Sequence, residues 1–106
     1  MEQKRNAQCA LTSVIENELD ILRRHIHVLT VLKEHQPMGI IKLSELTGYP
    51  QHMVRYSLRI LEQEKLIEPS SRGAVVTDNF KPTLKDLVKA LKHINTSTEE
   101  ILRNIQ

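Results

Sequence analysis

Aromatic residues are scarce in this sequence. Phe80, Tyr49 and Tyr56 are the whole set in 106 residues, and tryptophan is absent. The hydrophobic core must therefore be built from Leu, Ile and Val, a composition that favours packed helices. The hydrophobic content of 40% supplies one modest core rather than two, so we expect a single folded unit.

Cysteine is nearly absent as well, because Cys9 is the only one. A single cysteine excludes an internal disulfide and a cysteine cluster for zinc, and it predicts a cytoplasmic protein. The five histidines are scattered. His25 and His27, two positions apart, would diverge by about 200° on a helix, so we expect neither a metal nor a cofactor.

Long apolar runs are missing too, since no stretch approaches the roughly 20 residues that a membrane helix needs. The first 20 residues interrupt their apolar positions with Glu, Asn and Asp, which predicts neither a signal peptide nor a membrane span. We also find no catalytic Ser-His-Asp order, no phosphate-binding glycine loop and no paired carboxylates, so we do not expect an enzyme. The net charge of +2 permits a polyanionic partner without requiring one.

The three glycines and four prolines divide the chain, because each falls where the periodicity of the sequence changes. The breaks predict a mostly α-helical fold with a small β-hairpin, in the order helix, helix, helix, hairpin, helix. Three segments follow: an N-terminal helix in 1–36, two short helices and the hairpin in 37–80, and a C-terminal helix in 81–106.

The middle segment begins with two helices joined by a tight turn. Gly48 can adopt the left-handed conformation that ends a helix, and Pro50 can begin the next one. Val54, six positions after Gly48, can pack back against the first of these helices at Leu43 and Leu46. This spacing predicts a helix-turn-helix, although an ordinary helical hairpin would also satisfy it.

Two short apolar runs after these helices predict the hairpin. Leu66 and Ile67 form the first expected strand, residues 74–76 form the second, and a loop over 69–73 joins them. A hairpin in this position favours a winged helix-turn-helix over an ordinary helical hairpin. Arg72 lies at the expected tip, where a long cation can enter a minor groove or contact phosphate.

The helix expected over 51–64 carries its cations on one side. Advancing about 100° per residue, the side opposite Val54 collects hydrogen-bond donors and cations, whereas Glu62 and Glu64 come only in the last turns. Such side chains match base edges and phosphates in a major groove. The predicted contacts to double-stranded DNA are Lys42 on the preceding helix, Gln51, His52, Arg55, Tyr56 and Arg59 on this helix, and Arg72 in the hairpin.

The C-terminal segment has apolar residues at alternating steps of three and four, with Thr98 as one polar substitution. This heptad pattern predicts a coiled-coil helix that pairs with a second copy of the chain. The predicted dimerisation residues are Leu84, Leu87, Leu91, Ile94, Ile101 and Ile105. The first helix has similar steps, so either helix or both can form the interface.

Five cations and four glutamates between residues 37 and 77 give a charge of only +1, and a homodimer would double the contacts to DNA.

The stretch from Ile40 to Val76 resembles the winged helix-turn-helix of prokaryotic regulators in the broad MarR-like and ArsR-like group. The run from Val54 to Pro69, VRYSLRILEQEKLIEP, is similar to small archaeal members. One departure is Lys65, which stands where the family normally has a glycine. A left-handed lysine costs about 1 kcal/mol, so either the turn differs here or this cost is tolerated. The resemblance implies sequence-specific binding of duplex DNA by a homodimeric transcriptional regulator, more often a repressor than an activator.

A winged helix that binds protein in a transcription-related complex is the alternative interpretation, because the same fold can act without touching bases. The near-neutral charge of the middle segment favours it. Met53 and Ile60, which we expect to be exposed beside the cationic face, favour it as well.

Overall fold

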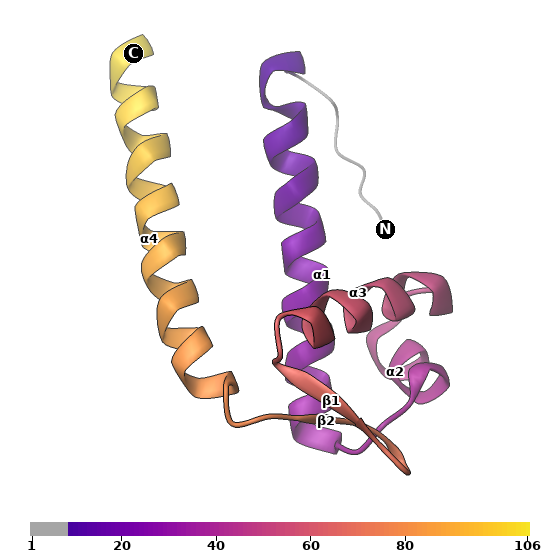
Figure 1. Ribbon diagram of the computed structural model, residues 1–106. Helices are drawn as coiled ribbons and strands as arrows, with labels where there is room; N and C mark the ends of the chain where they lie inside the picture. Colours follow the sequence, from indigo (N-terminus) through magenta and orange to yellow (C-terminus); the bar gives the residue numbers. More distant parts are fainter. Residues whose placement is uncertain (1–8) are drawn as a thin grey trace.

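The computed structural model describes residues 9–106 and has the predicted order of elements (Figure 1). Helices α1 and α4 are long and rise side by side from a smaller unit that contains α2, α3 and the hairpin. The described chain is thus mostly helical with a two-stranded antiparallel sheet. The elements are a 3-10 turn η1 (Ala10–Thr12), α1 (Ser13–His35), α2 (Ile40–Thr47), α3 (Gln51–Gln63), β1 (Ile67–Ser70), β2 (Gly73–Val76) and α4 (Phe80–Ile105).

The core lies where the C-terminal half of α1 meets α2 and α3. Leu29 and Leu32 of α1, Leu43 of α2 and Val54 of α3 are at most 1% exposed. Full burial of one such side chain contributes about 1.5–3 kcal/mol to folding. The N-terminal half of α1 takes no part in this core, and Val14 near its start is 70% exposed.

The turn between α2 and α3 forms as predicted. Gly48 ends α2 with a left-handed φ of 83°, and its N–H donates to the carbonyl of Ser44 at 2.9 Å. The carbonyl of Pro50 accepts the N–H of Val54 at 3.1 Å, which starts α3. Val54 is buried with Leu43, whereas the side chain of Leu46 is 48% exposed.

The hairpin is tighter than predicted. Its register pairs Ile67 with Val76 and Ser70 with Gly73, so the chain reverses over two residues rather than over a loop of five. Leu66 is buried but precedes the strand. We expected Pro69 and Gly73 to lie in the loop, outside the strands. In the structure both residues are paired within the hairpin, Pro69 with Ala74 and Gly73 with Ser70.

Met38 joins the hairpin in a way that the sequence pattern did not predict. Its backbone N–H and carbonyl pair with Ala74 at 3.1 and 2.9 Å, which ties the segment between α1 and α2 to β2. This approach explains Gly73, because a Cβ at that position would come within 2.6 Å of the Met38 carbonyl carbon. Glycine is therefore required there on steric grounds.

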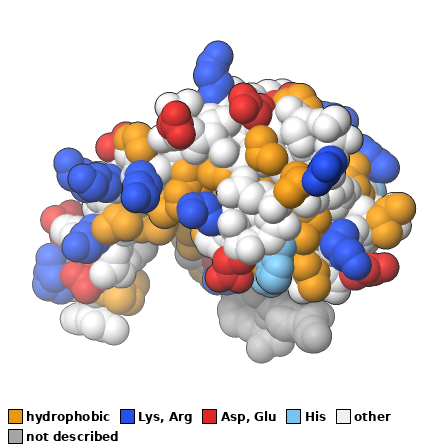
Figure 2. All heavy atoms as spheres, turned by 90° about the horizontal axis from the view of Figure 1, so that it is seen from below, with side chains coloured by type: hydrophobic (Ala, Val, Ile, Leu, Met, Phe, Trp, Pro, Cys, Tyr) orange, Lys and Arg blue, Asp and Glu red, His pale blue; other side chains and the backbone are white. Residues whose placement is uncertain are grey.

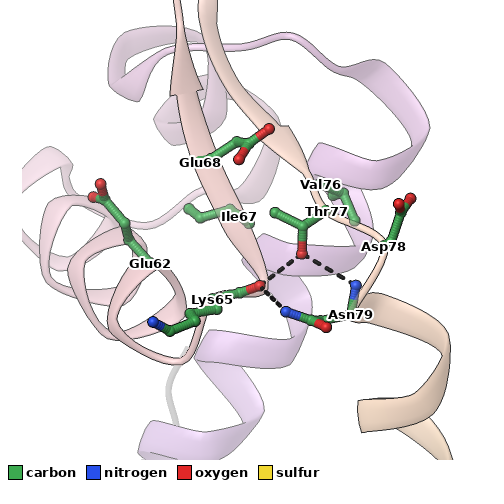
Figure 3. A pocket seen from close by; sticks show the side chains of 8 residues that line it. All are labelled: Glu62, Lys65, Ile67, Glu68, Val76, Thr77, Asp78 and Asn79. Atoms are coloured by element: carbon green, nitrogen blue, oxygen red, sulfur yellow. Dashed lines mark hydrogen bonds between the residues drawn. The ribbon is translucent and has the colours of Figure 1, made fainter.

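Lys65 ends α3 in a left-handed conformation, with φ of 63°. Its carbonyl accepts hydrogen bonds from Thr77 Oγ1 at 2.6 Å and Asn79 Nδ2 at 3.0 Å (Figure 3). These bonds connect the end of α3 to the start of α4, and they hold the strained turn in place. Lys65 therefore adopts the left-handed conformation, and the fold tolerates its cost.

Helix α4 begins at Phe80, one residue before the segment 81–106 in which it was expected. Pro82 still lies in the first turn, where the N–H groups have no intrahelical partner. Phe80 is half-buried against the core, and Lys33 Nζ lies 5.4 Å from the centre of its ring. No residue of α4 is fully buried. The helix packs against the core through Phe80 in its first turn.

No helix within residues 9–106 is both long enough and apolar enough to cross a membrane. The same described part contains no group of three His, Cys, Asp or Glu side chains arranged to hold a metal ion. The first eight residues of the predicted N-terminal segment lie outside the described residues.

We predict that Lys65→Gly raises the free energy of unfolding by about 1 kcal/mol, because glycine adopts positive φ without a Cβ clash. The bonds from Thr77 and Asn79 go to the backbone carbonyl and persist in this variant. Urea unfolding monitored by circular dichroism measures the change.

The neighbouring Glu64→Gly is the matched control. Glu64 has φ of −85°, so glycine relieves no strain there and should lower stability by about 0.5–1 kcal/mol. Equal effects of the two substitutions would contradict the assignment of strain to Lys65.

Candidate nucleic-acid interface

Helix α3 buries one side and exposes the side on which most of the DNA contacts were predicted. Val54, Ser57 and Leu61 are its buried residues. All five predicted contacts on this helix are exposed: Gln51, His52, Arg55, Tyr56 and Arg59. The helix therefore presents donors and cations outward from a core that holds it by its apolar side.

A depression of about 590 Å³ between α2 and α3 brings predicted residues from both helices together. Lys42 of α2 lines it with Gln51 and Arg55 of α3. Glu45 also lines it, and its carboxylate lies 3.9 Å from Lys42 Nζ. Because both side chains are well exposed, this ion pair is weak and leaves Lys42 able to contact another anion.

A second depression, of about 450 Å³, lies between α3 and the hairpin and shares Arg55 with the first. Arg59 lines it from α3, Ser70 and Gly73 line it from the hairpin, and Glu62 and Glu68 line it as well. Arg72 occupies the exposed turn of the hairpin, where its backbone nitrogen lies 3.3 Å from Ser70 Oγ. Predicted cations on α2 and α3 thus line two depressions that share Arg55, together with three glutamates.

Acidic side chains limit this surface at the far end of α3. Glu62 and Glu68 line a third depression, of about 560 Å³, with Asp78 and the lone cation Lys65 (Figure 3). The predicted cations of α3 lie within its first nine residues, and the carboxylates beyond them repel phosphate. From the hairpin end of the molecule, Lys and Arg side chains are interspersed with Asp and Glu rather than forming one basic patch (Figure 2).

Tyr56 differs from the other predicted contacts, because its ring is held against α1. Arg24 Cζ lies 5.7 Å from the ring centre, and the ring of His25 lies 5.8 Å away. The side chain is 43% exposed, so it borders the cationic face instead of projecting from its middle.

A buried polar cluster links α1 to α3 directly behind this tyrosine. Ser57 is 0% exposed, and Arg24 Nε donates to its hydroxyl oxygen at 3.0 Å. The same hydroxyl also hydrogen-bonds His25 Nδ1, at 2.8 Å, either as donor or as acceptor through its second lone pair. These two bonds connect α1 to α3 at this point.

The sequence pattern contained one sign of this cluster. Ser57 lies three positions after Val54 on the apolar side of α3, where a polar residue needs a buried partner. The partners Arg24 and His25 come from more than 30 residues away, so spacing alone could not identify them.

Met53 and Ile60, expected to be exposed, are both half-buried. They lie on the side of α3 that faces α1, which covers part of each. The exposed apolar residues of this unit are instead Ile41 and Leu46 on α2, at 63% and 48%.

Comparison with known proteins adds little to this geometry, since no protein-family model matches the chain. The chain is similar to an uncharacterised protein of Methanocaldococcus jannaschii, with 32% identity over 62 residues. The aligned part covers 58% of this chain and 16% of that relative, so the chain spans only a small part of the relative's length. The similarity assigns no activity.

The cluster around Ser57 makes folding stability depend on pH. Burial of the ring, and secondarily the charge of Arg24, lowers the pKa of His25 below its ordinary value of 6.5. As the pH falls, the unfolded chain therefore takes up this proton before the folded chain does. Stability is fully present above the unfolded pKa and is lost as the pH falls from about 6.5 toward the folded pKa.

We predict that His25→Asn reduces this loss, because asparagine can accept the Ser57 proton through Oδ1 but does not titrate. Denaturant unfolding at about pH 7.5 and pH 5.5 measures the difference for each protein. His35→Asn, at an exposed position in the last turn of α1, is the control and should keep the wild-type pH dependence. Identical pH dependence in the two variants would refute a role for His25.

Proposed function

We propose that this chain is a winged helix-turn-helix transcriptional regulator that binds specific sequences of duplex DNA as a homodimer. The observation that carries the proposal is that Lys42, Arg55 and Arg59 line two depressions, joined at Arg55, that extend from α2 across α3 to the hairpin. In this proposal α3 is the recognition helix and the β1–β2 hairpin is the wing. Repression by occupying the DNA site is the expected outcome.

The first nine residues of α3, from Gln51 to Arg59, suit insertion into a major groove. An α-helix fits that groove, and side chains near its N-terminus reach base edges. Arg55 and Arg59 can pair with the acceptor edge of guanine, and Gln51 can pair with adenine. Lys42, across the shared depression from Arg55, would contact the phosphate backbone and set the position of the helix.

The wing would extend the contact along the duplex. Arg72 lies on a two-residue turn at the end of the hairpin, and its side chain is exposed. A single long cation at such a tip fits a minor groove, where negative potential is strongest at narrow sites. His52 and Tyr56 would border the same duplex from α3.

Two exposed apolar stripes support a dimer. On α4 the predicted residues are only partly covered, with Leu91 38% exposed, Ile94 40% and Ile101 58%. On α1, Val14 is 70% and Ile15 56% exposed. Exposed apolar surface on this scale marks an interaction site.

The two stripes meet in an apolar cleft. Its volume is about 480 Å³, and Leu19, Leu22 and Ile26 of α1 line it opposite Leu91 of α4. A second copy that inserted its own α4 there would cover both stripes, so both terminal helices contribute to the proposed interface. Two recognition helices would then face two half-sites of the duplex.

We predict that Arg55→Ala and Arg59→Ala each weaken binding to a selected duplex by about 1–3 kcal/mol, because each removes a cation from the proposed reading face. The duplex would first be recovered from a random pool, and mobility shifts across a salt series would then give the affinities. Arg103→Ala, in the last turn of α4, is the control and should bind like wild type.

Absence of duplex binding at low salt, or indifference to both arginine substitutions, would contradict the proposal. A protein-interaction module is the second candidate, and the exposed Ile41 and Leu46 favour it. It would replace the first candidate if a stable protein partner were lost on Ile41→Asp but retained on Arg55→Ala.

We predict that Leu91→Glu with Ile94→Glu converts the dimer to a monomer, because both charges would be buried in the proposed interface. Sedimentation equilibrium measures the mass. His93→Glu adds a charge on another side of the same helix and should leave the dimer intact. A wild-type chain that sediments as a monomer, or a double variant that stays dimeric, would refute the interface.

A further inference from the structure

Four lysines form a second basic surface, on α4. Lys81, Lys85, Lys89 and Lys92 follow one another at steps of four, four and three, and all four are exposed. At 3.6 residues per turn they lie within an arc of about 80°. We call these four residues the lysine arc. Several Lys or Arg side chains lie on the left-hand lobe in Figure 2, which α4 forms.

The lysine arc lies away from the apolar stripe. On the same helical geometry, the middle of the arc is about 145° from the middle of the stripe that contains Leu87 and Leu91. A homodimer formed through the stripe would therefore leave the lysines open to solvent in both copies. Their exposure is compatible with the proposed assembly and does not depend on it.

The charge of the lysine arc is not balanced by neighbours. Among the described residues, none of the ion pairs involves these lysines. Asp86 is the only acidic residue between positions 80 and 98, so residues 80–93 carry +3. Like charges four residues apart repel and weaken an isolated helix. An anionic partner would remove this repulsion.

The basic charge is confined to the half of α4 next to the hairpin. The other half, residues 94–106, has two glutamates and one arginine and carries −1. Asp78 and Asn79 separate the +3 half from the unit of residues 37–77, which carries only +1. Positive charge is therefore concentrated next to the proposed DNA-binding unit, which has little net positive charge itself.

The spacing of the lysines suits a polyanion with regular charges. Successive members at four-residue steps are about 6 Å apart along the helix, and the arc spans about 16 Å. Duplex DNA offers one negative charge per roughly 1.7 Å of its axis, so each lysine has a phosphate within reach along such a track. A single small anion would engage only part of the arc.

We propose that the lysine arc binds phosphates of duplex DNA beside the sequence read by α3 and supplies affinity that does not depend on sequence. The proposal rests on the proposed function, because it names a second contact to the same partner. In a dimer, two arcs would add eight lysines to the contact. This contact compensates for the near-neutral charge of residues 37–77.

The test compares wild type with two quadruple variants, in which all four lysines become Gln or all four become Arg. Affinity for a random-sequence duplex is measured across a salt series, with the oligomeric state and helix content of each protein checked beforehand. Each phosphate contact contributes about 0.9 to the slope of log affinity against log salt. We expect Lys→Gln to flatten the slope by up to about 3–4 per chain, and Lys→Arg to retain it.

A variant with Arg55→Ala and Arg59→Ala separates this proposal from the proposed function. Preference for the selected duplex should fall in that variant, while salt-dependent binding to random duplex persists. If the slope of log affinity against log salt were unchanged in the Lys→Gln protein, the lysine arc would not be a DNA contact. Sequence-specific binding by α3 would be unaffected by that result.

Random-duplex binding that needs the lysines, without any sequence preference in wild type, would support the arc and overturn sequence-specific reading. No duplex binding by wild type would overturn both.

A parallel arm uses vesicles of phosphatidylcholine and phosphatidylserine. Lysine-dependent binding to these vesicles, without binding to duplex, would overturn the arc as a DNA contact.

Discussion

The rest of the structure depends on the packing of the C-terminal half of α1 against α2 and α3. Leu29 and Leu32 contribute from α1, Leu43 from α2 and Val54 from α3, and all four are almost fully buried. This contact holds α3 by its apolar side, so its polar side must face outward. It also uses only half of α1, which leaves the other half, like most of α4, with uncovered apolar residues. The outward-facing polar side of α3 and the uncovered apolar residues of α1 and α4 therefore both follow from this packing.

Charge is distributed unevenly over this framework, and the distribution matters more than the total of +2. Cations occupy the start of α3, carboxylates occupy its end, and lysines cover one side of the first half of α4. A long polyanion could meet several of these regions at once, whereas a small ligand would meet one. This arrangement supports duplex DNA as the proposed partner better than the net charge does.

Periodicity predicted the order and type of the elements from α1 to α4, because the side on which apolar residues recur depends on neighbours along the chain. The short 3-10 turn η1 was not predicted. Periodicity failed where burial depends on another element, since Met53 and Ile60 were expected to be exposed and are half-buried. The pairing of Met38 with Ala74 was missed because it joins residues 36 positions apart. The lysine arc is visible in the sequence as steps of four, four and three.

The sequence by itself determined the turn at Gly48 and the outward side of α3, which follow from backbone preferences and from the spacing of nearby residues. The turn at Lys65 was indicated only by the family resemblance, and the structure decided that its φ is positive. Only the tertiary structure decided that Lys42 and Gln51 share a depression with Arg55, and that Ser57 is held by Arg24 and His25. These groupings depend on how helices far apart in the chain pack together, and the pattern within one helix contains no information about its neighbour.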